Sequence, residues 1–345
     1  MGKSLDKDRK KERLLWLDFG KAIGILVVLL VHAECALGPV TYYGGMFYMP
    51  IFFVAAGYTY RHREEETLLE FLKKKARRLL MPYIAASGFL WLFFWVKDSL
   101  LGKNPTDIRI TSLLGILYSR NQYYTMEYTQ ENPVLLDILN APLWFLTAMF
   151  LTYLWYELIV RSQKKKLLLA LGLMASILWH YCTMRLLPWS LDAVPYFACY
   201  LWVGEQMRKK EEEKRLGELW FLGLLLVVFL LSSNLNGSVN LSCGGYGHSM
   251  LLCLLAGSSG SLLIFAVGMW LEQRYMMIAK LCSLVGQETL WILCLHMFLY
   301  MFFKTGAELL GLLEWLAKAL MVFGSLGILT VVGRVVHRKK RKTEV

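Results

Sequence analysis

The stretch AIGILVVLLVHAECALG, residues 22–38, decides the fold of this chain. A helix that crosses the hydrocarbon core of a bilayer needs about 17–25 mostly apolar residues, and this run meets that length. Since backbone groups cannot stay unpaired in lipid and the run does not alternate, it predicts a spanning helix rather than a barrel strand. The basic residues before it also fit a signal peptide with a loose cleavage site at residues 36–38, although the run is longer than the usual signal core.

The composition of the whole chain extends this interpretation. Of the 345 residues, 57% are hydrophobic and 19% are charged, and the mean hydropathy is +0.44. Soluble domains carry roughly 45–50% apolar and about 25% charged residues. Lys and Arg number 38 against 26 Asp and Glu, so the net charge is +12. These values argue against a disordered chain, a coiled coil, a secreted disulfide scaffold and a soluble nucleic-acid-binding protein.

We therefore predict an all-α, polytopic membrane helix bundle of about ten transmembrane helices, forming a single domain over residues 1–345. The sequence contains no repeat with a period of about 20–50 residues and no appended soluble domain. The longest segment between spans, about 97–141, predicts an outer loop with a short interfacial helix around Ser112 to Tyr118. The predicted spans are residues 22–38, 44–60, 79–96, 142–160, 167–184, 191–207, 216–233, 249–271, 287–303 and 309–334.

The positions of the basic residues predict the orientation. Lys and Arg gather in the loops that face the cytoplasm. With the N-terminus inside, 31 of the 38 Lys and Arg fall on the cytoplasmic side. This distribution predicts a multi-pass protein of the cell membrane with both termini cytoplasmic, as a basic arm at 1–21 and a basic tail at 335–345. The seven cysteines include no CxxC pair, so we predict no metal site.

The first helix carries the polar residues that point to chemistry, because ionisable groups within a span are costly. At about 100° per residue, Lys21 and His32 lie only about 20° apart around the helix, and Asp18 lies about 40° to the other side. The axial distance from Lys21 to His32 is about 16 Å. A cation and an imidazole are therefore expected to face one cavity, with Asp18 on the same stripe and Glu34 two residues after His32.

Several stretches resemble the membrane O-acyltransferases of acyltransferase family 3, in the order in which that family has them. The family opens with a basic residue, ten residues of any kind and then His, which the stretch RLLWLDFGKAIGILVVLLVHA matches with Lys21 and His32. The sugar O-acetylase-like branch is the most similar. The other similar stretches are FYMPIFFVAAGY (47–58), FLKKKARRLLMPY (71–83), APLWFLTAMF (141–150) and LVGQETLWILCLH (284–296).

The resemblance implies transfer of an acyl group, usually acetyl from acetyl-CoA, to a hydroxyl of a surface glycan, a lipid-linked sugar or a small acceptor. It implies His32 as the general base, with Asp18 or Glu34 as candidates for orienting its ring. Trp144 and His296 are candidates on the acceptor side; the alternatives are anchoring at the membrane interface for Trp144 and a structural role, which we favour, for His296. Acetyl-CoA is then a co-substrate rather than a bound cofactor, and the lipid bilayer, the acyl-CoA donor and the hydroxyl acceptor are the partners. The residues that would bind donor phosphates are Lys21, Lys74, Lys75, Arg77 and Arg78.

Two departures from the family pattern concern the donor side. Many members have Arg at the position of Lys21, and Arg-x-x-Arg where this chain has Lys74-x-x-Arg77 and Lys75-x-x-Arg78. The charge is kept, but the bidentate fork of an Arg is lost at the first position of each frame. The family's usual range indicates a bacterial protein. Neither the oligomeric state nor the identity of the acceptor follows from the sequence.

Two alternative functions fit the same topology. A transporter or an exporter of a polar or lipid-linked substrate could use the polar stripe as a permeation site, although the chain lacks the two related halves that transporters often show. A non-catalytic membrane sensor or partner subunit also fits, but gives no reason for His32 to share a stripe with Lys21. Of the three, an acyltransferase best explains the stripe.

Overall fold

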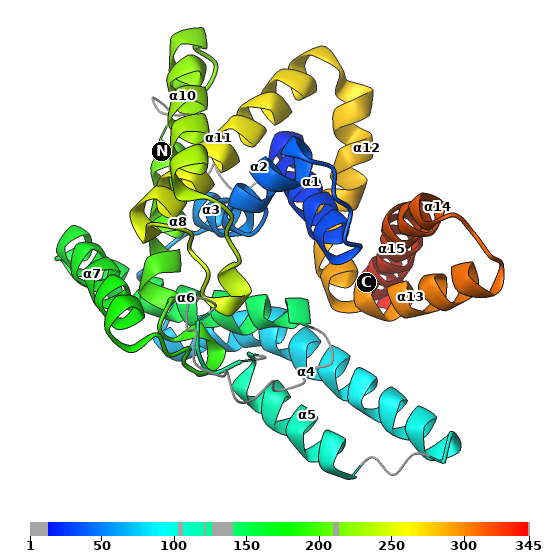
Figure 1. Ribbon diagram of the computed structural model, residues 1–345. Helices are drawn as coiled ribbons and strands as arrows, with labels where there is room; N and C mark the ends of the chain where they lie inside the picture. The colour runs from blue at the N-terminus through cyan, green and yellow to red at the C-terminus, as the bar shows by residue number, and fades with distance from the viewer. Residues whose placement is uncertain (1–12, 103–105, 121, 126–140, 210–213, 344–345) are drawn as a thin grey trace.

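The computed structural model describes residues 13–102, 106–120, 122–125, 141–209 and 214–343 (Figure 1). The regular secondary structure of this part of the chain is helical, apart from two isolated β-bridges. Residues 1–12 of the predicted arm and 344–345 of the tail lie outside it.

Eight helical segments of the described residues are long and apolar enough to cross a membrane, which confirms the predicted helical membrane bundle. They are α1 (Leu15–His32), α4 (Leu68–Leu100), α6 (Trp144–Arg161), α7 (Lys165–Thr183), α10 (Leu219–Asn236), α11 (Met250–Arg274), α13 (Thr289–Leu309) and the continuous α14 (Glu314–Ala319), η4 (Leu320–Gly324) and α15 (Ser325–Thr343).

Two shorter segments take the places of the second and sixth predicted spans. The second is broken into α2 (Pro39–Phe47) and α3 (Pro50–Thr59), because a proline lacks the backbone N–H that would continue the first helix. The sixth is α8 (Val194–Met207). With these two segments, the prediction of about ten spans agrees with the structure. The helix predicted in the long loop is also present, as α5 (Thr106–Tyr118).

Glycines allow α3 and α8 to cross at backbone contact. A Cβ on Gly57 would lie 1.9 Å from the carbonyl oxygen of Leu201, and a Cβ on Gly204 would lie 1.9 Å from that of Val54. Only glycine fits at both positions, in the manner of small-residue contacts between membrane helices. The crossing keeps Met49, just before α3, fixed against the centre of the bundle, where it is 4% exposed.

Helix α1 lies in the middle of the bundle, with α2, α3 and α11 on one side and α12 (Met276–Gln287) and α13 on the other (Figure 1). In the 18-residue stretch of α1 that is long enough to span a membrane, 61% of the residues are buried. The corresponding value for α7, at the edge of the bundle, is 22%. A central helix can carry polar groups because protein, rather than lipid, surrounds them. This position explains how Asp18, Lys21 and His32 are tolerated.

The bounds of two regions differ from the prediction. The first span was expected at 22–38, whereas α1 begins at Leu15 and ends at His32. It extends into the charged residues because these neutralise one another, as described below. The segment 271–289 was expected to be a loop but contains α12, which packs against α1. The small buried residues Ala279, Ser283 and Gly286 face that contact at helical spacing.

Candidate active site

One face of α1 lines two adjoining cavities. Leu17, Lys21 and Ile25 line the first, which has a volume of about 340 Å³ and is called here the Lys21 cavity. Val28 and His32 line the second, of about 430 Å³, called the His32 cavity. Because these five residues follow one another at steps of three or four, they form one stripe along the helix. The stripe joins a cation at one end to an imidazole at the other.

The two cavities meet at Met49 and Leu293, which line both of them. Met49 precedes α3 and Leu293 lies on α13, so neither belongs to α1. The sequence predicted a single cavity in front of Lys21 and His32. The structure divides this space into two, with these apolar side chains at the junction. A substrate that reaches from Lys21 to His32 passes along Met49 and Leu293.

The ring of His32 contacts a second imidazole. His32 Nδ1 lies 3.3 Å from His296 Nε2 on α13, and the ring centroids are 5.2 Å apart. His296 Nδ1 lies 2.9 Å from the carbonyl oxygen of Ile292 and 3.1 Å from that of Leu293. Since a carbonyl only accepts, His296 Nδ1 carries the proton and its Nε2 is an acceptor in the neutral ring. His32 Nδ1 therefore donates to His296, and the lone pair of the neutral His32 ring is on Nε2.

This contact selects the tautomer in which His32 is able to accept a proton at Nε2, since the bond of one ring nitrogen determines the state of the other. His296 is fully buried and lines neither cavity. Tyr300, one turn further along α13, packs edge-on against the His296 ring and donates to the Leu29 carbonyl at 2.8 Å. The sequence left His296 either an acceptor-side or a structural role, and in the structure its ring lies behind that of His32.

Asp18 is the buried centre of a charged cluster at the start of α1. Its carboxylate lies 2.5 Å from Lys21 Nζ and 2.6 Å from Arg13 Nε, and it accepts from Ser283 Oγ at 3.0 Å. The α12 backbone comes this near because residue 286 is glycine: a Cβ there would lie 1.9 Å from the Asp18 carbonyl oxygen. Asp18, an orienting candidate for His32, is thus bonded to Lys21 and positions that ammonium at the Lys21 cavity.

Glu34, the other orienting candidate, lies beyond the end of α1. Its φ is 52°, so the chain turns away from the helix there. Its side chain is exposed, and its backbone carbonyl accepts from Lys318 Nζ at 3.0 Å. In the described structure the side chain within hydrogen-bond distance of the His32 ring is that of His296, and neither predicted carboxylate is bonded to it.

Two of the five cations predicted to bind phosphate line the Lys21 cavity, namely Lys21 and Arg78. The ammonium of Lys21 is shared with Asp18. Arg78 lies on α4 and makes no ion pair or hydrogen bond with the residues that the structure describes. Its guanidinium is therefore the cation of this cavity that can take an anionic ligand without giving up another bond.

The other three predicted cations lie elsewhere. Lys75 Nζ lies 3.3 Å from the ring centroid of Tyr153, which itself lines the Lys21 cavity, so Lys75 acts on the cavity only through that ring. Lys74 Nζ pairs with Glu66 at 2.7 Å, and Arg77 is exposed and lines neither cavity. Neighbours on one helix point in different directions, and the sequence does not say which of them faces the cavity.

Gln287 and His337 are among the polar residues of the Lys21 cavity that were not predicted from the sequence. Gln287, at the end of α12, donates from Nε2 to Ser283 Oγ at 3.0 Å and so extends the Asp18 cluster. It lies within the family-like stretch 284–296, which is a signal that could have identified it. His337, on α15, also lines the cavity. It belongs to the basic tail, whose charge was used to predict the orientation in the membrane, and the packing of α15 on α13 brings it to the site.

The His32 cavity carries hydroxyl, amide and aromatic groups. Trp144, the first residue of α6 and one of the acceptor-side candidates, lines it and is 4% exposed. A polar surface next to aromatic rings suits a ligand with several hydroxyl groups. The other polar lining residues are Thr41, Tyr42, Tyr48, Ser238, Asn240, Ser242 and Cys243.

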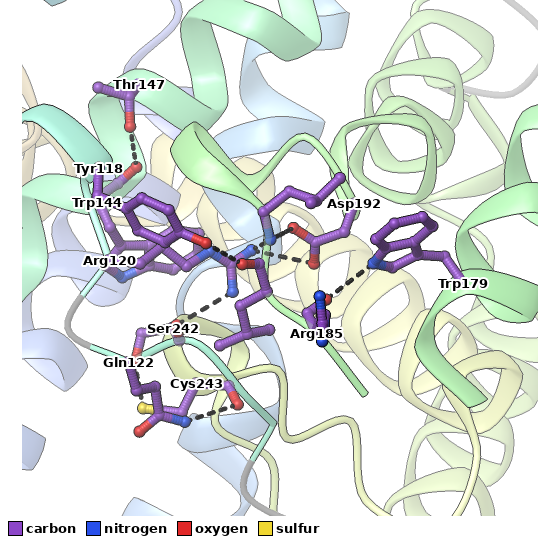
Figure 2. A network of polar contacts seen from close by, with 12 residues as sticks. Tyr118, Arg120, Gln122, Trp144, Thr147, Trp179, Arg185, Asp192, Ser242 and Cys243 are labelled. Carbon is purple, nitrogen blue, oxygen red and sulfur yellow. Dashed lines mark hydrogen bonds and ion pairs between the residues drawn. The ribbon is translucent and has the colours of Figure 1, made fainter. Parts of the chain in front are cut away.

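A buried ion pair supports one wall of this cavity. Arg120 Nη2 lies 3.3 Å from both carboxylate oxygens of Asp192, and Arg120 Nη1 donates to the Ser242 carbonyl at 3.4 Å (Figure 2). Gln122 Nε2 donates to the Cys243 carbonyl at 3.3 Å. Arg120 is 1% exposed, so Asp192 compensates its charge inside the protein. Two lining residues, Ser242 and Cys243, are thereby held from behind.

Comparison with known protein families adds a finding that covers nearly the whole chain. A family model described as an acyltransferase domain matches residues 14–336, a range that includes His32, His296 and every lining residue of both cavities except His337. No curated protein and no solved structure matches the chain.

Proposed function

Because this chain belongs to the family of that acyltransferase domain, and is thus a membrane acyltransferase, we propose that it is an O-acyltransferase. The proposed donor is acyl-CoA, with acetyl as the acyl group, and the proposed acceptor is a hydroxyl of a surface glycan, a lipid-linked sugar or a small molecule. The observation that carries the proposal is the α1 stripe, which joins a cationic cavity to a cavity that contains an oriented imidazole.

The Lys21 cavity suits the donor. Its cations, Lys21 and Arg78, match the phosphates of CoA. From there Ile25, Met49 and Leu293 form an apolar path towards the His32 cavity, which suits the uncharged pantetheine arm and the thioester at its end. Lys21 and His32 are separated by about 16 Å along α1, a distance that an extended arm can bridge. The enzyme would thus hold the reacting carbonyl near His32 by binding the donor at its other end.

The reaction follows from the tautomer of His32. The acceptor oxygen attacks the thioester carbon while its proton passes to His32 Nε2. The new C–O bond forms, the C–S bond breaks with its electron pair on sulfur, and the imidazolium returns the proton to the CoA thiolate. During the step His32 Nδ1 keeps its bond to His296 Nε2, and this bond strengthens when the ring is charged.

We propose direct transfer, without an acylated residue of the enzyme. A cysteine relay requires a thiolate, and burial raises the pKa of the Cys35 thiol, three residues after His32. Cys243 lines the His32 cavity next to Ser242, with 3.5 Å between Sγ and Oγ, and its neighbour is a hydroxyl rather than a base. No second group beside either thiol would take its proton, in the contacts that the structure describes.

The distribution of basic residues supports an orientation for this chemistry. We propose that the Lys21 cavity opens to the cytoplasm, where CoA thioesters are made, and that the His32 cavity faces the outer half of the membrane. Both termini are then cytoplasmic, and the cell membrane is that of a bacterium. The acyl group crosses the bilayer along the α1 stripe, while the donor and the acceptor stay on opposite sides.

The test is the His32→Ala variant. Loss of a general base typically lowers the rate about 10²–10⁴-fold, so we expect O-acetylation of surface glycans, measured by mass spectrometry in complemented deletion cells, to fall to background. His180→Ala is the matched control, because His180 is a buried histidine on α7 that lines neither cavity. Acetylation that persists with a folded His32→Ala protein would refute the proposal.

A further inference from the structure

The C-terminal helix α15 contributes a side chain to the Lys21 cavity. His337 lines this cavity, and its side chain is 54% exposed, against 24% for Lys21. The two residues therefore lie at different depths, with Lys21 further inside and His337 near the opening. The proposed acyl-CoA donor would extend over the same two depths. Its thioester would reach inward to the His32 cavity, and its nucleotide, at the other end, would stay near the opening.

His337 is held in place by a buried carboxylate. Its Nδ1 lies 2.9 Å from Glu288 Oε2 and 3.1 Å from Oε1, and Glu288, between α12 and α13, is 2% exposed. A buried carboxylate is costly unless a donor compensates it, so this contact attaches α15 to the start of α13. With Nδ1 committed to Glu288, the ring has Nε2 left for a ligand.

A glycine permits this approach. A Cβ on Gly333, one turn before His337, would lie 2.4 Å from Glu288 Oε2 and 2.9 Å from Trp291 Cδ1. Trp291 also lines the Lys21 cavity. Because residue 333 has no side chain, α15 lies close enough to Glu288 for His337 to reach both the carboxylate and the cavity.

From this arrangement we propose that His337 binds the 3′-phosphate of the CoA donor, with Glu288 as the positioning residue. The inference rests on the proposed function, since it assigns the outer end of the same donor site. In the proposed complex Nδ1 of the ring donates to Glu288 and Nε2 donates to the phosphate. Lys21 and Arg78 then serve the pyrophosphate, which lies between the 3′-phosphate and the pantetheine arm.

The experiment measures the dissociation constants of CoA and of 3′-dephospho-CoA, by isothermal titration calorimetry, with the full-length protein in phosphatidylcholine nanodiscs. His337→Ala is expected to weaken CoA binding about tenfold and to leave 3′-dephospho-CoA binding unchanged, because one charged hydrogen bond is removed. Unchanged binding of 3′-dephospho-CoA also shows that the variant is folded.

Two further variants accompany this test. Glu288→Gln is expected to weaken the binding of CoA relative to that of 3′-dephospho-CoA, as His337→Ala does. Arg338 is an exposed cation next to His337 that does not line the cavity, so Arg338→Ala is expected to change neither dissociation constant.

Three results would overturn the inference. Equal weakening of both ligands would assign His337 to another part of the donor, and unchanged CoA binding would remove it from the site. An effect of His337→Ala that appears only when phosphatidylglycerol is added to the nanodiscs would assign the ring to a lipid headgroup. Failure of the wild-type protein to bind either ligand would instead overturn the proposed function, and the inference with it.

Discussion

The Lys21 cavity and the His32 cavity share one helix but differ in the origin of their functional groups. In the Lys21 cavity the polar groups come from four elements, because Lys21, Arg78, Gln287 and His337 lie on α1, α4, α12 and α15. In the His32 cavity the group proposed to react is one imidazole, oriented by one other. In the function proposed above, donor binding is thus distributed over several contacts, whereas catalysis depends on a single pair. Substitutions should therefore have graded effects in the first cavity and severe effects in the second.

The largest effect after loss of His32 itself is expected at His296. His296→Ala removes the acceptor of His32 Nδ1, so the ring is no longer restricted to the tautomer with its lone pair on Nε2. We expect kcat to fall about 10²-fold with little change in the dissociation constant of CoA, since His296 lines neither cavity. Steady-state assays of CoA release and calorimetry measure the two quantities. His296→Asn, whose amide oxygen can accept, should restore part of kcat; a parallel loss of CoA affinity would contradict this role.

A smaller effect is expected at Lys21. Lys21→Met removes one charged contact to the donor, which corresponds to about 1.5–3 kcal/mol, or about tenfold or more in affinity. The KM for acetyl-CoA should rise by that factor while kcat changes little, and Asp18 keeps Arg13 and Ser283 as partners. Lys21→Arg, which retains the charge, is the control. If kcat falls as it does for His296→Ala, then the division of roles between the two cavities is wrong.

The smallest effect is expected at Lys75. Its ammonium stacks on the Tyr153 ring, and a contact of this kind contributes about 0.5–1 kcal/mol. Lys75→Ala should raise the KM for acetyl-CoA by no more than about fivefold. Lys74→Ala, which removes a partner of Glu66 away from the cavity, should leave the KM unchanged. A tenfold rise for Lys75→Ala would mean that Lys75 leaves Tyr153 to bind phosphate, as the sequence analysis expected.

Much of the membrane architecture was predictable because it depends on local composition. Apolar runs of sufficient length predicted the long helices, and the family-like stretches indicated the acyltransferase domain that the family model confirms. The predictions that differ from the structure concern segments whose conformation depends on tertiary contacts. The charged start of α1 was taken for an arm outside the span, since the sequence does not show that Arg13, Lys21 and Ser283 surround Asp18. Helix α12 was missed because its small residues become a packing face only against α1.

By itself the sequence determined that Lys21 and His32 share one face of a membrane-spanning helix, because the helical period sets the angle between residues on the same element. Only the tertiary structure decided what each of them contacts. His296 meets His32 across 264 residues of sequence, and His337 reaches the Lys21 cavity because Gly333 lets α15 approach Glu288. These contacts depend on how separate helices pack, and the spacing of residues along the chain contains no information about that distance.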